Sequence, residues 1–281
     1  MIVLSVACSI LIPAHNEVGY IEDCLEALLA SDSTGSAVEV IVMANGCTDA
    51  TAQVARGYAA RFTQKGWPLS VVNLARGGKM GALNAGDTLA AHGARIYLDA
   101  DVIVAPPLIA QLAQVLAGEG PRYASGAPVV VAKGSAFTRA YARFWESLPF
   151  CTHGVPGFGI FAVNRAGRAR WGDFPDIISD DTFVRLSFAP HERLRVPATY
   201  RWPMIEGAGP LVRVRRRQDI GVAEVRERYP ELWQNHDPAP ADAPPLWRRA
   251  LRDPLGFGAF AAVALGVRLP HRAQDRWARG R

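Results

Sequence analysis

Several features are missing from this 281-residue sequence, and each absence excludes a class of protein. No apolar run reaches the roughly 18 residues that a membrane-spanning helix needs. The few cysteines show neither a CxxC pair nor a metal-ligand spacing, which excludes a disulfide framework and a cysteine-based zinc site. We expect them to be free, buried thiols in a reducing compartment: Cys8, Cys24, Cys47 and Cys151.

The N-terminus lacks the basic residues that precede the apolar core of a signal peptide. Residues 1–14, MIVLSVACSILIPA, are apolar, but they continue directly into the polar sequence HNE. We interpret this segment as a first buried strand and expect a cytoplasmic protein.

Acidic residues are in the minority, with 26 Asp and Glu against 31 Lys and Arg, which gives a net charge of +5. A basic balance favours phosphates, an acidic lipid surface or nucleic acid as partners. Aromatic and basic residues do not interleave along a stripe, so we expect no nucleic-acid partner.

The first half of the chain alternates short apolar runs with amphipathic segments of helix length. The apolar runs are continuous, which is typical of strands buried on both faces of a parallel sheet. Strands are predicted at 5–14, 37–44, 69–74 and 94–102, and helices at 20–31, 49–66 and 79–93. This order predicts an α/β fold, with a mainly parallel central sheet flanked by helices.

The second half is less regular. We expect a strand at 122–132, a helix at 135–148, and a glycine-rich turn and strand at 154–164. Residues 237–245, DPAPADAPP, are interpreted as a linker to a C-terminal segment, residues 246–281.

Polar clusters fall at the carboxyl ends of three of the predicted strands: HNE, NGCTD and DAD. The carboxyl ends of parallel strands meet at one edge of a sheet, which is where ligands bind in such folds. In the last cluster, Asp99 and Asp101 suit a hard divalent cation shared with phosphate oxygens. An extended segment would point both carboxylates the same way and Ala100 the other way. A solvated exit from the strand is the alternative.

The stretch ARGGKMGALNAG places Lys79 at the start of a predicted helix, which suits a diphosphate or a nucleotide base. Its spacing is not that of a phosphate-binding P-loop, so it is not a kinase or ATPase element. A surface lysine at an ordinary helix N-terminus is the alternative. His15, Asn16 and Glu17 suit hydrogen bonds to a base and ribose, while Asn16 also suits a helix N-cap.

These motifs, in this order, resemble the family 2 glycosyltransferases, which have the GT-A fold. The family patterns P-x-x-N-E, D-G-S-T-D-x-T, G-K-x-x-A-L-N-x-G and D-x-D correspond to residues 13–17, 45–51, 78–86 and 99–101. The resemblance implies a nucleoside diphosphate sugar donor, with a UDP-sugar favoured, and a divalent metal, Mn²⁺ or Mg²⁺. It implies donor contacts at Pro13, His15, Asn16, Glu17, Asn45, Asp49, Lys79, Asp99 and Ala100.

The same resemblance makes Asp101 the principal metal ligand, with Asp99 on the metal or the ribose. Asn45 departs from the family pattern, which usually has an aspartate facing the base at this position. The departure leaves the identity of the nucleotide open.

The resemblance continues more loosely to about residue 221. GVPGFGIFAV looks like the glycine-rich turn of the acceptor region, which implies acceptor contacts at Gly157, Phe158 and Gly159. ISDDTFVRL looks like the acidic pair of the family, with Asp181 as the catalytic base and Asp180 beside it. The chemistry agrees, because an attacking hydroxyl needs a carboxylate to take its proton. A helix N-cap with acids in the first turn is the alternative.

Processive members carry Q-x-x-R-W, and LVRVRRRQDIG at 211–221 looks like this region. Arg213 and Arg217 fall on basic positions that suit a diphosphate clamp, but Val214 replaces the glutamine and Gln218 the tryptophan. We therefore expect transfer of a single sugar. A solvated helix face or a lipid-headgroup patch is the alternative for these arginines.

The resemblance implies a GT-A domain at 1–236, with a nucleotide-sugar half at 1–104 and an acceptor half at 105–236. The C-terminal segment has an apolar run at 255–267 between arginines, too short to span a bilayer. It either lies on an anionic membrane surface or docks on the domain. Membrane binding would place the protein peripherally on the inner face of the membrane, with a lipid-linked acceptor.

The predicted reaction is the inverting transfer of one sugar to an acceptor hydroxyl, in glycolipid or surface-polysaccharide synthesis. A sugar-phosphate nucleotidyltransferase has a similar sheet, but it would carry G-x-G-x-R after the first strand, where this chain reads PAHNEVGY. The other alternative is a catalytically silent nucleotide-sugar binder at the membrane, which intact Asp101 and Asp181 oppose.

Overall fold

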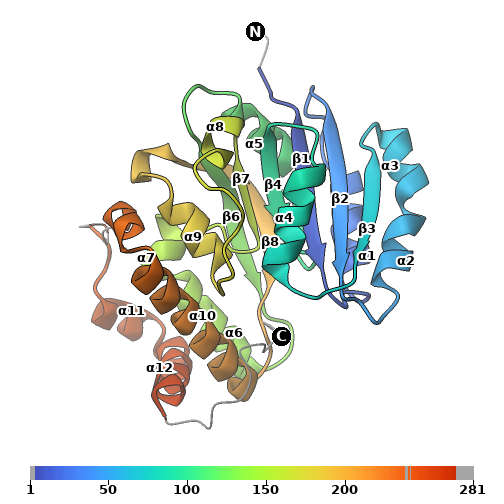
Figure 1. Ribbon diagram of the computed structural model, residues 1–281. Helices are drawn as coiled ribbons and strands as arrows, with labels where there is room; N and C mark the ends of the chain where they lie inside the picture. The colour runs from blue at the N-terminus through green and yellow to red at the C-terminus, as the bar shows by residue number, and fades with distance from the viewer. Residues whose placement is uncertain (1–3, 238–239, 241, 270–281) are drawn as a thin grey trace.

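The computed structural model describes residues 4–237, 240 and 242–269, and it shows a central sheet with helices on both faces (Figure 1). The strands are β1 (Cys8–Ala14), β2 (Val38–Asn45), β3 (Leu69–Leu74), β4 (Ala94–Leu98), β5 (Ile103–Val104), β6 (Tyr123–Val131), β7 (Ile160–Val163) and β8 (Arg193–Pro203). Their order in the sheet is β3-β2-β1-β4-β7-β6-β8-β5.

The helices of the first half are α1 (Ile21–Leu29), α2 (Thr51–Gly57), α3 (Ala59–Lys65), α4 (Lys79–Leu89) and α5 (Leu108–Leu116). Those of the second half are α6 (Ala136–Glu146), α7 (Pro149–Thr152), α8 (Arg165–Arg168), α9 (Asp180–Leu186), α10 (Ala208–Arg228), α11 (Leu246–Arg252) and α12 (Pro254–Arg268), with 3-10 turns η1 (Pro190–Glu192) and η2 (Pro230–Asn235). The predicted α/β fold with a central sheet flanked by helices is confirmed.

The direction of the strands sets which of their ends meet. β3, β2, β1 and β4 are parallel to one another. β7 is antiparallel to both β4 and β6, while β8 is parallel to β6. β8 therefore points the same way as β4, so the carboxyl ends of β1, β2, β4 and β8 lie at one edge of the sheet.

The continuous apolar runs are explained by burial on both faces. Ile10 and Ile12 of β1 pack in a core with α1 and α5, while Leu11 between them packs in a second core with α4. All three are fully buried. Because side chains alternate along a strand, a strand covered on both faces needs apolar residues at every position.

Two predicted elements differ from the structure in their extent: one helix is divided in two, and one strand is shorter than predicted. The helix predicted at 49–66 is interrupted at Tyr58, whose N–H bonds to the carbonyl of Ala55 instead of continuing the helical ladder, directly after the weak helix former Gly57. The strand predicted at 94–102 ends at Leu98.

The DAD segment that follows β4 is a turn, so the predicted extended conformation of this segment is wrong. The Val102 N–H donates to the carbonyl of Asp99 at 3.1 Å, which closes the turn. The Asp99 N–H donates to the carbonyl of Gly159 at 2.8 Å, which ties the turn to the segment before β7. Ala100 between the two carboxylates is buried in the core.

The C-terminal segment docks on the domain as far as the structure describes it. Ala259 and Val263 of α12 are buried against α6 and α10, and Phe260 stacks on Tyr141 of α6. Figure 1 shows α12 beside these two helices. Arg216 of α10 donates to the carbonyls of Gly266 and Val267 at the end of α12. Residues 270–281 of the predicted segment lie outside the described residues.

The predicted linker begins with an anchored residue. The Asp237 carboxylate forms ion pairs with Arg185 at 2.8 Å and Arg193 at 2.7 Å. Linker residues 238–239 and 241 lie outside the described part of the chain. No helix within the described ranges is long and apolar enough to cross a membrane.

Candidate active site

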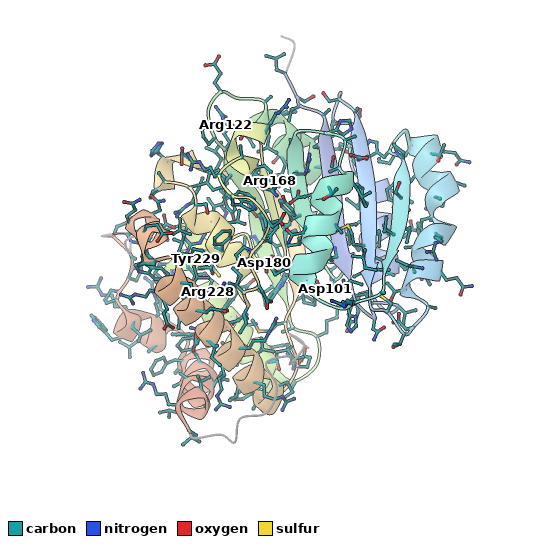
Figure 2. All side chains as sticks on the ribbon, in the orientation of Figure 1. Asp101, Arg122, Arg168, Asp180, Arg228 and Tyr229 are labelled. Atoms are coloured by element: carbon teal, nitrogen blue, oxygen red, sulfur yellow. The ribbon has the colours of Figure 1, made fainter. Side chains whose placement is uncertain are left out.

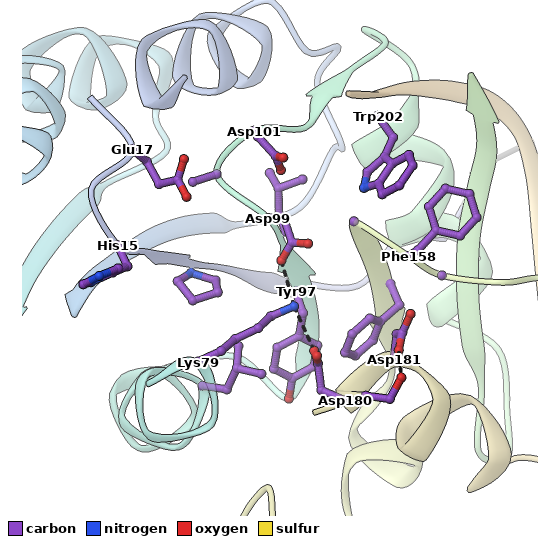
Figure 3. A pocket seen from close by; sticks show the side chains of 18 of the residues that line it. His15, Glu17, Lys79, Tyr97, Asp99, Asp101, Phe158, Asp180, Asp181 and Trp202 are labelled. Carbon is purple, nitrogen blue, oxygen red and sulfur yellow. Dashed lines mark hydrogen bonds and ion pairs between the residues drawn. The ribbon is translucent and has the colours of Figure 1, made fainter. Parts of the chain in front are cut away.

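A cavity of about 450 Å³ opens at the edge of the sheet where β1, β2, β4 and β8 end. Its wall is built from the loop after β1, the start of α4, the turn after β4, the glycine-rich segment before β7, and one face each of α9 and α10. The predicted residues on this wall are Pro13, His15, Asn16, Glu17, Asn45, Lys79, Asp99, Ala100, Asp101, Gly157, Phe158, Gly159, Asp180, Asp181 and Arg217. Segments far apart in the sequence thus converge on one site (Figure 3).

Asn16 holds two loops of the cavity rim together. Its backbone φ of 54° is in the left-handed region, which asparagine tolerates better than most residues. Its Oδ1 accepts hydrogen bonds from the N–H groups of Thr48 at 2.7 Å and Asp49 at 3.3 Å. The side chain therefore organises the loop after β2.

Asn45 is buried, and its side-chain amide joins three segments. Nδ2 donates to the carbonyls of Ala14 at 2.9 Å and Met43 at 3.4 Å, and Oδ1 accepts from the Gly78 N–H at 3.0 Å. Its backbone carbonyl lies 2.6 Å from Nδ1 of His15. An aspartate could not donate to these carbonyls, so the departure from the family pattern has a structural role.

Two predicted donor contacts, Asp49 and Arg213, are not on the cavity wall. The Asp49 carboxylate accepts hydrogen bonds from Thr51 and from the Val18 N–H at 3.3 Å. Burial raises its pKa, but these hydrogen bonds outweigh burial and lower it. Arg213 is exposed on α10.

Lys79, the first residue of α4, bridges the two halves of the site. Its Nζ lies 2.9 Å from Oδ1 of Asp99 and 3.0 Å from Oδ2 of Asp180 (Figure 3). Burial lowers the pKa of this ammonium, but the carboxylates of Asp180 and Asp99 outweigh burial and raise it above its ordinary value. Lys79 therefore stays charged.

Asp180 is the most buried carboxylate of the site, with its side chain 6% exposed. Burial raises its pKa to about 6, because Lys79 only partly compensates and Asp181 and Asp99 add repulsion. Asp180 on α9 and Asp101 after β4 line the same cavity, and Figure 2 shows both near the middle of the molecule.

Asp181 is half-buried on the cavity wall, next to Asp180. Its Oδ1 accepts from the Thr182 N–H at 2.7 Å and from the Ser179 hydroxyl at 3.2 Å. These bonds orient the carboxylate at the start of α9. A carboxylate fixed at the wall of a cavity can accept a proton from a bound hydroxyl.

Asp99 and Asp101 are both half-buried in the turn after β4, on the cavity wall. Among the described residues, no group of three His, Cys, Asp or Glu side chains could hold a metal ion. Two carboxylates suit a hard cation, but they cannot complete its coordination. The donor set thus fits a divalent cation that is held together with oxygens of a bound ligand.

The glycine-rich segment before β7 needs its glycines. Gly157 and Gly159 have φ values of 72° and 77°. A Cβ at Gly159 would lie 2.8 Å from both Trp202 and Val102, and one at Gly157 would collide with the hydroxyl of Tyr123. These glycines let the segment approach the turn after β4 closely.

The arginines of α10 do not act as one group. Arg217 is on the cavity wall, and its buried Nε has no hydrogen-bond partner among the described residues. Arg215 pairs with Asp219 at 3.0 Å, and Arg216 contacts α12. Only Arg217 is therefore positioned to meet a ligand in the cavity.

The comparison with known proteins agrees with the motifs. A model of glycosyl transferase family 2 matches residues 9–174 of the chain. The chain belongs to this family.

Three known proteins are similar to this chain, and the two solved structures match it over more than that range. The uncharacterized glycosyltransferase EpsJ of Bacillus subtilis (strain 168) is 32% identical over 107 residues, which are 38% of this chain and 29% of that protein. The mannosyltransferase PcManGT from Pyrobaculum calidifontis, solved with GDP-Man and Mn²⁺, has a TM-score of 0.61 and 20% identity, and the match covers 94% of this chain and 74% of that one. S. aureus TarS 1-349 with UDP gives 0.52 and 14% identity, covering 93% and 89%. This likeness confirms the GT-A fold.

The sequence did not identify all of the wall of this family 2 site. Tyr20, Leu83, Tyr97 and Trp202 line the cavity, and Trp202 is the largest of them. One signal was present for Trp202, because it lies at the end of a strand. That signal becomes useful only when β8 is known to run parallel to β4.

Proposed function

We propose that the protein transfers one sugar from a nucleoside diphosphate sugar to an acceptor hydroxyl, with inversion, in a single displacement. The observation that carries this proposal is the arrangement of the cavity. The cavity has a volume of about 450 Å³. On one side it carries groups that suit phosphate and a cation, namely Lys79, Asp99 and Asp101, and Asp181 lies across from them. A single displacement needs one general base on the acceptor side, and α9 provides it.

The donor side suits a diphosphate. Lys79 begins α4, and the N–H groups of a helix start favour anions. Arg217 adds a guanidinium from the other wall, with a nitrogen still lacking a partner in the described structure. We infer a UDP-sugar as the first donor to test. The side-chain amide of Asn45 is already hydrogen-bonded to the backbone of Ala14 and Gly78, so other residues would contact the nucleotide base.

Asp101 and Asp99 would hold a divalent cation, Mn²⁺ or Mg²⁺, which neutralises the leaving diphosphate when bound. Asp99 already pairs with Lys79 at 2.9 Å. Donor binding would therefore reorganise this pair, with the Lys79 ammonium shared between the carboxylates and the phosphates.

The test is a donor screen followed by one substitution. Release of nucleoside diphosphate from UDP-, GDP- and dTDP-sugars is measured with Mn²⁺, with Mg²⁺ and with chelator. Asp181→Asn should reduce transfer by on the order of 10²- to 10⁴-fold and leave donor affinity unchanged. Tight binding of donors without any turnover would instead indicate a silent binder, and pyrophosphate release from nucleoside triphosphates a nucleotidyltransferase.

We further propose that the acceptor is presented by an anionic membrane, to which the C-terminal helices attach the protein peripherally. Trp247, Leu251 and Leu255 are 59%, 75% and 77% exposed. The first two are four residues apart on α11, so they share a face, and exposed Arg248 and Arg252 lie beside them. Exposed apolar side chains with basic neighbours suit the surface of acidic lipids.

α12 connects this surface to the site, because it packs on α10, which carries Arg217 on the cavity wall. The double substitution Leu251→Glu and Leu255→Glu should abolish co-sedimentation with anionic vesicles. Leu89→Glu, at a leucine 49% exposed at the end of α4, is the matched control. If the unaltered chain ignores anionic vesicles, the segment serves only the core.

A further inference from the structure

Trp202 gives the cavity an aromatic wall that the donor chemistry does not use. It lies at the carboxyl end of β8 and lines the cavity with Phe158. Figure 3 shows both rings on the side of Asp101 and Asp181, away from His15. The phosphate-binding Lys79 approaches from the opposite side in the same view.

The indole is held in place by its neighbours. Trp145 stacks on it, with ring centroids 5.8 Å apart and planes 17° apart, and Phe158 meets it edge-on at 5.0 Å. Gly159 approaches its pyrrole edge so closely that a Cβ there would lie 2.8 Å from Cδ1. The ring is therefore a preformed surface, and a ligand would not need to order it on binding.

The surroundings of this ring combine apolar and polar groups. Val214 and Gln218 of α10 and Pro203 of β8 line the same cavity, and Figure 3 shows the indole nitrogen directed into the cavity. An aliphatic chain would leave Gln218 and the carboxylates unmatched, which costs free energy. A pyranose ring matches both, because its C–H face is apolar and its rim carries hydroxyls.

We propose that Trp202 is the platform of the acceptor subsite, and that the acceptor group it binds is itself a sugar ring. The apolar face of the sugar ring packs against the indole, and a hydroxyl of the sugar is directed to the carboxylate of Asp181. This proposal rests on the proposed glycosyl transfer. It adds the chemical class of the acceptor and the residue that selects it.

The first experiment uses Trp202→Ala, Trp202→Phe and the control Trp247→Ala, at a tryptophan 59% exposed on α11. The probes are methyl glycosides of common hexoses and glucitol, an open-chain polyol with as many hydroxyls. Nucleoside diphosphate release is measured without and with each probe. Trp202→Ala should raise the half-saturating concentration of glycosides about tenfold, which corresponds to 1.4 kcal/mol, while Trp202→Phe stays near wild type.

Donor hydrolysis measured without a probe distinguishes a failure of the Trp202 platform from a failure of the proposed glycosyl transfer. If Trp202→Ala loses the preference for glycosides over glucitol, each measured relative to the variant's own donor hydrolysis without a probe, the platform is supported. Unchanged glycoside saturation in Trp202→Ala, or equal use of glucitol by the wild type, overturns it. If the wild type neither binds nor hydrolyses any donor, the proposed function itself fails.

A second measurement does not depend on turnover. The seven tryptophans are labelled as 5-fluorotryptophan, and the ¹⁹F resonance missing from Trp202→Phe identifies residue 202. With UDP and Mg²⁺ present, methyl glycosides should shift this resonance, while glucitol should not. A resonance that no glycoside shifts, or that glucitol shifts equally, contradicts the proposal even if Trp202→Ala does not fold.

Discussion

Replacing Lys79 with Met should destabilise the metal-free protein, and the loss should depend on pH. The substitution removes the ammonium 3.0 Å from the buried Asp180 and 2.9 Å from Asp99. The pKa of Asp180 is about 6 in the folded protein, against about 3.9 for an unfolded chain. The folded state therefore binds an extra proton between about pH 4 and pH 6, and the free energy of unfolding falls as pH rises through this window.

The size of that fall follows from the pKa difference. Two units correspond to about 3 kcal/mol, at about 1.4 kcal/mol for each unit. Without Lys79 the pKa of Asp180 rises further, so the free energy of unfolding keeps falling above pH 6 in the variant. Removing one partner of a buried ion pair typically costs about 3–5 kcal/mol. Because the Lys79 side chain is 38% exposed, solvent screening reduces this, and we expect about 1–3 kcal/mol at pH 8 and less than about 1 kcal/mol at pH 5.

The assay is urea unfolding at pH 5 and pH 8 with chelator present. Lys79→Arg keeps the charge and should retain most of the stability at pH 8. Lys133→Met, at an exposed lysine, should change stability equally at both pH values. Adding Asp180→Asn to Lys79→Met should remove the pH dependence. Equal losses at pH 5 and pH 8 for Lys79→Met alone would refute the reasoning, because Lys79 would then act through packing of its methylenes.

Two further predictions concern the turn after β4 and the segment packed against it. When Mg²⁺ or Mn²⁺ is present, Asp101→Asn should weaken binding of nucleoside diphosphate at least tenfold, about 1.4 kcal/mol, as measured by calorimetry. With chelator, the variant and the wild type should bind equally. If the variant binds more weakly by the same factor with chelator, Asp101 is not part of a metal site. Gly159→Ala should lower the free energy of unfolding by about 2–4 kcal/mol, because φ is 77° and the new methyl would meet Trp202 and Val102 at 2.8 Å. Gly172→Ala, where nothing lies within 4 Å of the added Cβ, is the control, and similar melting of both variants would show that the segment adapts.

The sequence was most informative where local pattern and sheet geometry act together. Continuous apolar runs predicted the first four strands, and parallel pairing then required their carboxyl ends to share an edge. That reasoning brought His15, Asn45 and Asp99 to one rim, as the structure shows. The exact end of β4 was not predictable, because its last residues become a turn through the long-range bond from Asp99 to Gly159.

Contacts between residues of the two halves of the chain could not be predicted from local sequence pattern. Lys79 was predicted to contact the donor and Asp180 to lie beside the catalytic base, but their mutual ion pair depends on where the start of α9 lies relative to α4. Trp202 reaches the cavity because β8 pairs with β6, out of sequence order. The C-terminal segment was predicted to bind a membrane or to dock on the domain. The buried side of α12 shows that it docks. Membrane attachment remains a proposal, which rests on the exposed leucines of α11.

The amide of Asn45 limits how this chain can evolve. An aspartate there would keep the acceptor for the Gly78 N–H, but it would place a second carboxylate oxygen against the carbonyl of Ala14, now 2.9 Å from Nδ2. Leaving such buried groups unmatched costs about 1–3 kcal/mol. A single-nucleotide return to the family's usual residue is therefore disfavoured until the end of β1 shifts. Changes in nucleotide preference should arise first elsewhere on the rim, where side chains can vary without loosening the junction of β1, β2 and α4.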